Sequence, residues 1–216
     1  MIFVLFQLDS CSFVWLNFWK SIGSFFLPQL TWTREVADKE VFLTFDDGPH
    51  PEITPWVVNE LDKVGAKATF FVVGENAQRY FTLVDKMQKS GHRVGNHTHR
   101  HIKGWRVSSK VYLEDIANCE NYLTENTIFR PPYGQINFAS IPAIRKKYEV
   151  VMWDVLSKDY LKRLNVKRAL KRIKKATKPG SIIVFHDSVK AETNLKAMLP
   201  NYLKFLEEEG YKMSVL

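Results

Sequence analysis

Four groups of polar residues each directly follow a short apolar run, and their types could support hydrolytic chemistry. The groups are Asp46-Asp47, His97 with His101, Arg130, and His186. The first two together offer a carboxylate and two imidazoles, a combination that binds a divalent metal ion and leaves one position open for water. Arg130 adds a cation, and His186 adds a side chain that can carry a proton.

The spacing of His97 and His101 suits a shared role as metal ligands. Residues four apart lie on one face of a helical turn, or of a loop with a similar course, so both imidazoles can reach one ion. Asp46 or Asp47 can supply the carboxylate. Histidines also cluster on surfaces without a ligand, but a pair of aspartates directly after an apolar run favours the metal site.

The adjacent aspartates Asp46 and Asp47 are expected to divide two tasks. Neighbouring side chains diverge at the end of a strand, so one carboxylate can bind the metal while the other faces the substrate as a general base. The alternative is a solvated turn, since Asp-Gly-Pro is common in turns. A turn accounts for Gly48 and Pro49, but not for two charges after so apolar a run.

Arg130 and His186 have settings that suit supporting roles. Arg130 stands between Phe129 and two prolines, where an arginine can hold a carboxylate through two hydrogen bonds and keep it ionised. His186 follows an apolar run typical of a buried strand. It could act as a general acid, and the alternative is a core histidine with satisfied hydrogen bonds.

Strand and helix patterns alternate from residue 41 onward, which predicts an α/β fold with a parallel sheet. About seven units suit an irregular (β/α) barrel or an open doubly wound sheet better than a full eight-stranded barrel. In either fold, functional residues lie at the carboxyl ends of strands, where the four groups fall. We predict strands at 41–45, 68–73, 93–96, 128–130, 149–152, 181–185 and 211–215, and helices at 54–64, 76–89, 108–124, 138–147, within 162–178 and at 191–209.

Residues 13–27 carry the pattern of an amphipathic helix that ends at Pro28. We expect this helix to pack on the core of the domain. The alternative is a peripheral contact with a membrane, where Trp and Phe are common. The start of the chain shows no convincing signal peptide, so the cell envelope and the cytoplasmic side of a membrane both stay open as locations.

The composition is that of a soluble globular protein with one main domain. The 216 residues are 45% hydrophobic and 25% charged, and the net charge of +8 suits anionic partners without choosing among them. Residues 162–178 contain nine Lys or Arg and no acid. We interpret them as an amphipathic helix with its basic face in water, and contact with an anionic surface is the alternative. Cys11 and Cys119 form no metal or disulfide pattern.

Four motifs stand in order along the chain: TFDDGP at 44–49, GNHT at 95–98 with His101, RPPYG at 130–134 and VFHD at 184–187. Their types, order and spacing resemble those of the polysaccharide deacetylases with a NodB homology domain, carbohydrate esterase family 4. The resemblance covers roughly residues 38–216. It implies a NodB-like irregular barrel over that range as the catalytic domain, with residues 1–37 as an N-terminal helix and linker.

The resemblance also implies roles for the first two motifs. Asp46 would be the general base, and Asp47, His97 and His101 would bind the metal. This metal is usually zinc in the family, although some members prefer cobalt, nickel or iron. Arg130 would hold Asp46.

Further roles follow for the later motifs. The backbone N–H of Tyr133 would stabilise the oxyanion, His186 would protonate the leaving nitrogen, and Asp159 would orient His186. The sequence departs from the family near Asp159, because Tyr160 stands where tryptophan is usual and Leu156 stands where an acid is usual.

The implied reaction is removal of N-acetyl groups from an amino-sugar polymer or oligomer, such as peptidoglycan or a chitin-like chain. We expect Pro132, Tyr133 and Tyr160 to contact this N-acetylated glycan. One alternative is a deacylase or deformylase of a small or lipid-linked sugar amide. Another is a non-catalytic binder of an anionic polymer, which the complete set of metal and base residues disfavours. We expect no nucleic-acid partner, and the oligomeric state stays open.

Overall fold

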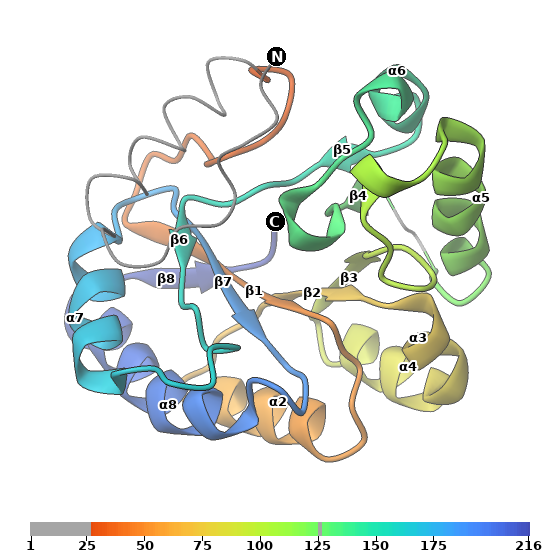
Figure 1. Cartoon of the computed structure of the whole chain (residues 1–216). Coiled ribbons are helices and arrows are strands. Elements are labelled where there is room, and N and C mark those ends of the chain that lie inside the picture. Colours follow the sequence, from red (N-terminus) through yellow and green to blue (C-terminus); the bar gives the residue numbers. More distant parts are fainter. Residues whose placement is uncertain (1–26, 125–126) are drawn as a thin grey trace.

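The computed structural model describes residues 27–124 and 127–216. The predicted amphipathic helix over residues 13–27 lies outside this part of the chain, apart from its last residue, so its packing stays a prediction. Figure 1 shows strands at the centre of the molecule and helices around them. Within the described residues, no helix is both long enough and apolar enough to cross a lipid bilayer.

Eight strands of the described chain form one sheet in which every ladder is parallel. Seven follow the order β5-β4-β3-β2-β1-β7-β6, and β8 pairs with β1 beside this path. This arrangement confirms the predicted barrel-like α/β fold with about seven parallel strands. The strands are β1 Glu40–Asp46, β2 Thr69–Val72, β3 Arg93–Asn96, β4 Ile128–Phe129, β5 Glu149–Val150, β6 Val155–Leu156, β7 Ile182–His186 and β8 Lys212–Ser214.

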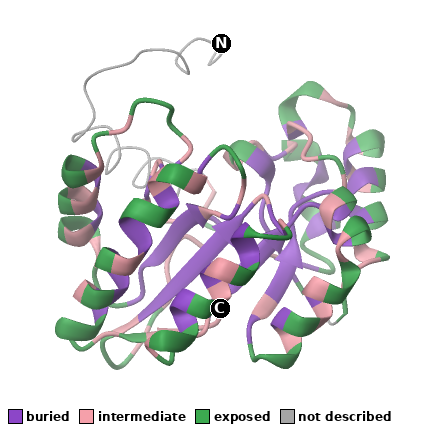
Figure 2. Cartoon of the chain, turned by 90° about the horizontal axis from the view of Figure 1, so that it is seen from below, coloured by how far each residue is buried: buried purple, intermediate pink, exposed green. Residues whose placement is uncertain are grey.

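Helices surround this sheet, and Figure 2 shows their exposed outer faces beside the buried strands. The amphipathic patterns of the sequence produce this arrangement, because each apolar stripe must pack on the sheet. The helices are α2 Ile53–Lys63, α3 Gly74–Arg79, α4 Phe81–Lys89, α5 Ser109–Glu120, α6 Ile141–Ile144, α7 Val166–Ala176 and α8 Glu192–Glu208. Within residues 27–124 and 127–216 there are also three short 3-10 helices, η1 Gly104–Arg106, η2 Pro132–Gly134 and η3 Phe138–Ser140.

The central strand β1 is buried on both faces, which explains its almost continuous apolar sequence. Side chains alternate between the faces of a strand. Val41, Leu43 and Phe45 therefore join the main hydrophobic cluster, which also contains residues of α2 and α8. Thr44 and Asp46 point to the opposite face of the sheet. Both are buried there, so their polar groups need hydrogen-bond partners within the protein.

One predicted helix is divided into two, and another is shorter than expected. The helix predicted at 76–89 is divided at Tyr80, whose φ of −122° and ψ of 42° are not helical. The backbone N–H groups of Gly74 and Glu75 donate to the carbonyls of Thr98 and His99 in the loop after β3. These hydrogen bonds tie the start of α3 to that loop. The helix predicted at 138–147 contains an α-helix only at Ile141–Ile144, after the short helix η3.

Strand β6 was not predicted, because two residues are too few for a periodic pattern. It pairs with β7 at Val155 and Leu156. The segment before β1 also joins the sheet, since Thr31 pairs with Val151 and Thr33 pairs with Ser181. These contacts tie residues 31–33 to the body of the protein, and the domain division proposed at residue 37 stays a prediction.

The basic stretch forms α7 with the polarity expected from its sequence. Ala169 and Ile173 are buried in the main cluster, while Lys167 and Lys171 are exposed. Arg172 is the exception, because its guanidinium donates to backbone carbonyls beside β6. Most of the positive charge of this helix therefore faces water, and one arginine supports the interior.

Candidate active site

The carboxyl ends of the strands bring the four predicted groups together. Asp46 and His186 end the neighbouring strands β1 and β7, and the register makes them Cα partners. His97 directly follows β3, and Arg130 directly follows β4. Because the ends of parallel strands meet at one edge of a sheet, all four groups lie at the same edge.

Asp47, His97 and His101 form a compact group at this edge. One ligand atom from each lies within 4.8 Å of the others. Asp47 Oδ1 is 3.0 Å from His101 Nε2 and 3.7 Å from His97 Nε2. Asp47 has a φ of 78°, so its side chain diverges from that of Asp46. Two imidazole nitrogens and one carboxylate oxygen fit a divalent metal ion with an open position.

The protonation states of this group suit a metal site. His97 Nδ1 lies 2.8 Å from the backbone oxygen of Arg130. A carbonyl only accepts, so Nδ1 carries the hydrogen and Nε2 keeps its lone pair toward Asp47. Burial lowers the pKa of His97 to about 4, which keeps the imidazole neutral at pH 7. Burial would raise the pKa of Asp47, but the hydrogen bond from His101 and the nearby histidines lower it.

The segment between the two histidines is a loop and not a helical turn. Thr98 and His101 have positive φ values of 62° and 54°. The buried carboxylate of Asp115 on α5 accepts the backbone N–H groups of His99 and Arg100, each at 2.9 Å. It also accepts Nε of Arg100 at 2.6 Å. Asp115 thus replaces the hydrogen bonds that a helix would supply and fixes the loop.

Arg130 is fully buried and holds Asp46. Its Nη1 donates to Asp46 Oδ1 at 2.7 Å and to Thr44 Oγ1 at 2.6 Å. Its Nη2 donates to the backbone oxygen of Met152 at 3.0 Å, and its Nε donates to that of Val151 at 3.3 Å. Burial lowers the pKa of Arg130, and the charge of Asp46 opposes this effect. Asp46 is therefore oriented by a buried cation, and its negative charge also acts on the neighbouring His97.

The carboxylate of Asp159 holds both the ring and the backbone N–H of His186. The Nδ1–Oδ1 distance is 2.7 Å, and the backbone N–H of His186 donates to Oδ2 at 2.8 Å. Burial would lower the pKa of His186, but the charge and hydrogen bond of Asp159 outweigh it and raise the pKa to about 9. Because Nδ1 is engaged, Nε2 is the nitrogen that can transfer a proton.

The segment that carries Asp159 is fixed from two helices. Arg172 on α7 donates to the backbone oxygens of Leu156 and Ser157 at 3.0 and 3.1 Å. Asn194 on α8 donates to the backbone oxygen of Asp159 at 2.7 Å. The hydroxyl of Ser157 donates to the carboxylate of Asp159 at 2.9 Å. These contacts limit the positions that the carboxylate can take.

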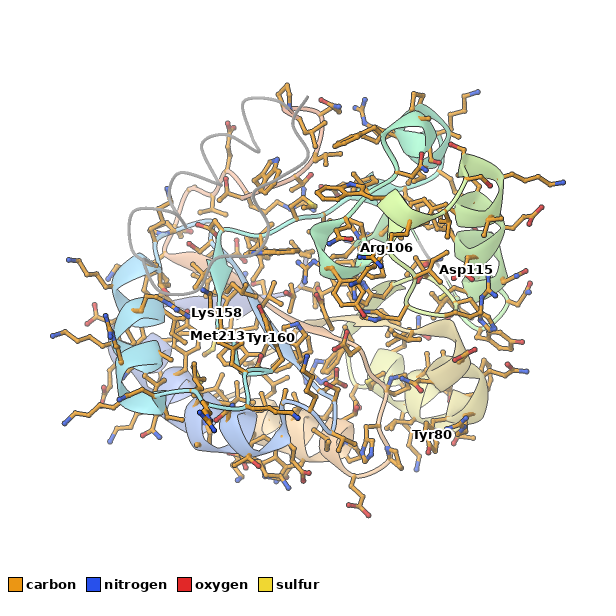
Figure 3. The ribbon with its side chains drawn as sticks, in the orientation of Figure 1. Tyr80, Arg106, Asp115, Lys158, Tyr160 and Met213 are labelled. Carbon is orange, nitrogen blue, oxygen red and sulfur yellow. The ribbon has the colours of Figure 1, made fainter. Side chains whose placement is uncertain are left out.

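The predicted substrate residues lie around the same edge. The ring of Tyr133 is 4.6 Å from that of His101 and Tyr133 is 55% exposed, whereas Pro132 is buried. The ring of Tyr160 packs edge-on against His186 at 5.0 Å. Figure 3 labels Tyr160 on the side of the view where α7 lies and Arg106 on the side where α5 lies. The contacts of these residues with a substrate stay predictions.

The sequence matches the family model described as polysaccharide deacetylase over residues 33–152. The chain belongs to this family. A peptidoglycan-N-acetylglucosamine deacetylase of Bacillus cereus is 33% identical over 190 residues, and the match covers 85% of this chain and 89% of that protein. A chitooligosaccharide deacetylase of Azorhizobium caulinodans is 32% identical, with 68% of this chain and 73% of that protein covered.

The fold of this deacetylase-family chain agrees with a solved structure of a peptidoglycan N-acetylglucosamine deacetylase. The TM-score is 0.81 at 29% identity, and the match covers 87% of this chain and 91% of that one. The predicted family is confirmed. So is the predicted enzyme class, a hydrolase acting on carbon–nitrogen bonds other than peptide bonds.

One buried acid of this deacetylase-family site received no role from the sequence. Asp187 is 1% exposed, and Thr54 Oγ1 donates to it at 2.5 Å. A Cβ at Gly48 would lie 2.1 Å from the Asp187 carboxylate, so the turn after Asp47 requires glycine. Burial raises the pKa of Asp187 to about 8, which keeps the carboxyl largely neutral at pH 7. The Asp-Gly-Pro turn therefore packs against a buried acid and is not the solvated turn that the sequence left as an alternative.

Asp154, the acid next to Trp153, belongs to the scaffold of the site. Its carboxylate accepts the hydroxyl of Ser181 at 3.0 Å and the backbone N–H of Ile182 at 2.8 Å. Both contacts are at the start of β7, and His186 ends this strand. Asp154 thus anchors β7, and its role does not need the substrate.

We predict that Asp115→Ala weakens zinc binding about tenfold or more. Residues that orient the metal ligands through hydrogen bonds typically change metal affinity by such a factor. Titration of the metal-free protein against a zinc-chelating dye measures the affinity. The neighbouring Glu114→Ala is the matched control, since Glu114 is exposed and pairs only weakly with Lys110 at 4.0 Å. Equal zinc affinities for the two variants would contradict the role given to Asp115.

We predict that Asp159→Asn lowers the pKa of His186 from about 9, because the charge and hydrogen bond of Asp159 are lost while burial still lowers the pKa and only the weaker charges of Asp47 and Asp46 still raise it. NMR titration of the imidazole in the metal-free protein measures this shift. Asp62→Asn on α2, an exposed acid that pairs with Lys67, is the control and should leave the pKa unchanged.

The pair formed by His186 and Asp159 also predicts that the free energy of unfolding depends on pH. The folded pKa of His186 lies above its ordinary value, so the contribution of the pair is complete below pH of about 6.5 and is lost as the pH rises through about 9. The difference in unfolding free energy between wild type and Asp159→Asn should therefore shrink between pH 7 and 10 in urea titrations. A constant difference would exclude a charged pair.

Proposed function

We propose that this enzyme removes N-acetyl groups from an N-acetylglucosamine-containing glycan, such as peptidoglycan or a chitin-like oligomer. The observation that carries the proposal is the geometry of three separate units at one sheet edge. These units are the group of Asp47 with two histidines, the base candidate Asp46 on Arg130, and His186 on Asp159. The names of the two relatives, 33% and 32% identical, support the glycan substrate.

A divalent ion, with zinc favoured by the two nitrogen and one oxygen donors, would be held by Asp47, His97 and His101. Such an ion polarises a carbonyl oxygen and lowers the pKa of a coordinated water. Asp47 supplies the negative charge of the ligand set, and the neutral His97 supplies a nitrogen lone pair. Cobalt, nickel or iron would meet the same donors.

Asp46 acts as the general base in this proposal. Its carboxylate is 4% exposed and is oriented by Arg130 at 2.7 Å. The arginine orients the carboxylate so that it can accept the proton of the attacking water. The backbone N–H of Tyr133, beside His101, donates to the oxygen that becomes negative during the attack.

His186 acts as the general acid. An amide nitrogen leaves poorly as an anion, so it must gain a proton as the carbon–nitrogen bond breaks. Asp159 keeps His186 protonated at neutral pH, with a pKa raised to about 9. Asp46 and His186 are register partners on adjacent strands, so the proton acceptor and the proton donor face one reacting group.

The cell envelope is the location that a peptidoglycan substrate would require. A membrane contact through residues 13–27 would then keep the enzyme close to its polymer. Both statements depend on the glycan assignment, and contact of the purified full chain with vesicles would test the second.

We predict metal-dependent acetate release from N-acetylated chito-oligosaccharides. Metal-free protein should release no acetate above background, and zinc or cobalt should restore the release. Asp46→Asn should reduce kcat by about 100-fold or more, in the range of general base catalysis, while zinc affinity is retained. Asp62→Asn on α2, an exposed acid paired with Lys67, is the control.

Different results would select other functions. Zinc binding without acetate release from any chito-oligosaccharide would favour a small or lipid-linked sugar amide as the substrate. Full activity in Asp46→Asn would overturn the role of the base. A chain that binds glycan but neither zinc nor cobalt would be a binding protein.

A further inference from the structure

Two aromatic side chains beside the site are strongly exposed. Trp105 in η1 is 45% exposed and Phe138 in η3 is 58% exposed. Their ring centroids lie 6.2 Å apart with an interplanar angle of 32°. Water solvates such rings poorly, so a neighbouring pair of exposed rings marks a surface that is covered when a partner binds.

The backbone holds this aromatic pair in place. The N–H of Gly104 donates to the backbone oxygen of Gln135 at 3.0 Å. The side-chain amide of Asn137 donates to the backbone oxygens of Gly104 and Val107 at 3.3 and 3.0 Å. A Cβ at Gly104 would lie 2.5 Å from the Gln135 oxygen, so the two segments approach each other closely. The rings are therefore presented by a cross-linked pair of segments, which reduces the entropy lost on binding.

The aromatic pair is continuous with the metal group. Trp105 is on the segment that follows His101, and Phe138 is on the segment that follows Tyr133. The ring of Tyr133 is 4.6 Å from that of His101, and Lys103 Nζ lies 4.7 Å from the centroid of the Tyr133 ring. The two segments that carry the exposed pair thus lead directly from His101 and Tyr133, the residues beside the candidate metal ligands.

We propose that Trp105 and Phe138 form a binding surface for a sugar ring of the glycan, separate from the sugar whose acetamido group reacts. This inference rests on the proposed function. The faces of a pyranose ring carry C–H groups and stack on aromatic rings, while its hydroxyl oxygens remain at the edge. Lys103, between the two positions, can donate to those oxygens. The occupant is an uncharged N-acetylated sugar unit farther along the same chain.

Chain-length dependence of turnover tests this surface. The variant Trp105→Ala/Phe138→Ala should raise KM for an N-acetylglucosamine pentamer about tenfold, as expected for the loss of two aromatic contacts, with kcat unchanged. The dimer, which leaves most of the surface uncovered, should show a much smaller effect. Trp105→Phe/Phe138→Tyr keeps both rings and should retain the wild-type KM. Phe81→Ala on α4 removes a phenylalanine that is 51% exposed elsewhere and serves as the control.

Binding without turnover separates this inference from the proposed function. Zinc-loaded Asp46→Asn protein is titrated with the pentamer by calorimetry, with and without the two alanine substitutions. A loss of affinity of about tenfold supports the surface, even where no acetate release is found. Equal affinity, or an equal loss for dimer and pentamer, overturns it, even where the enzyme is an active deacetylase.

Discussion

The buried guanidinium of Arg130 links the two halves of the site. Its side chain orients the carboxylate of Asp46, and its backbone oxygen fixes the ring of the metal-ligand candidate His97. A buried charge that loses its partner costs several kcal/mol, so Thr44, Asp46 and two backbone carbonyls form a set that must stay complete. The positions of the proposed base and of a proposed metal ligand are thus set by one residue directly after β4.

Backbone strain is concentrated in the loops that carry and orient the residues of the site. In the described part of the chain, the non-glycine residues with positive φ are Asp47, Thr98, His101, Tyr133 and Lys158. All of them lie in segments that follow strands toward the site. Each such conformation costs of order 1 kcal/mol or more, and it persists only where surrounding contacts enforce it. The parallel sheet supplies that enforcement, because it fixes both ends of neighbouring loops at one edge.

The sequence was sufficient for the positions of the site residues but not for their supports. Apolar runs such as 41–45 predict strands, and parallel strands bring their carboxyl ends together, so Asp46, His97 and His186 could be placed at one edge in advance. Asp115, Arg172 and Asn194 could not, because their partners are backbone groups of distant loops and no spacing in the sequence encodes them. Strand β6 and the division at Tyr80 likewise depend on tertiary contacts that override local patterns.

The distribution of charge explains how similar carboxylates can take different roles. Asp46 is paired with Arg130, Asp159 is paired with His186, and burial raises the pKa of Asp187 to about 8. Among these neighbouring acids, Asp47 is the one that faces the two imidazoles of the ligand group. A divalent cation would therefore be attracted to Asp47, while Asp46 is held by Arg130. The proposed division into base and ligand follows from the partner that each carboxylate contacts, so adjacent residues of one type can take different chemical roles.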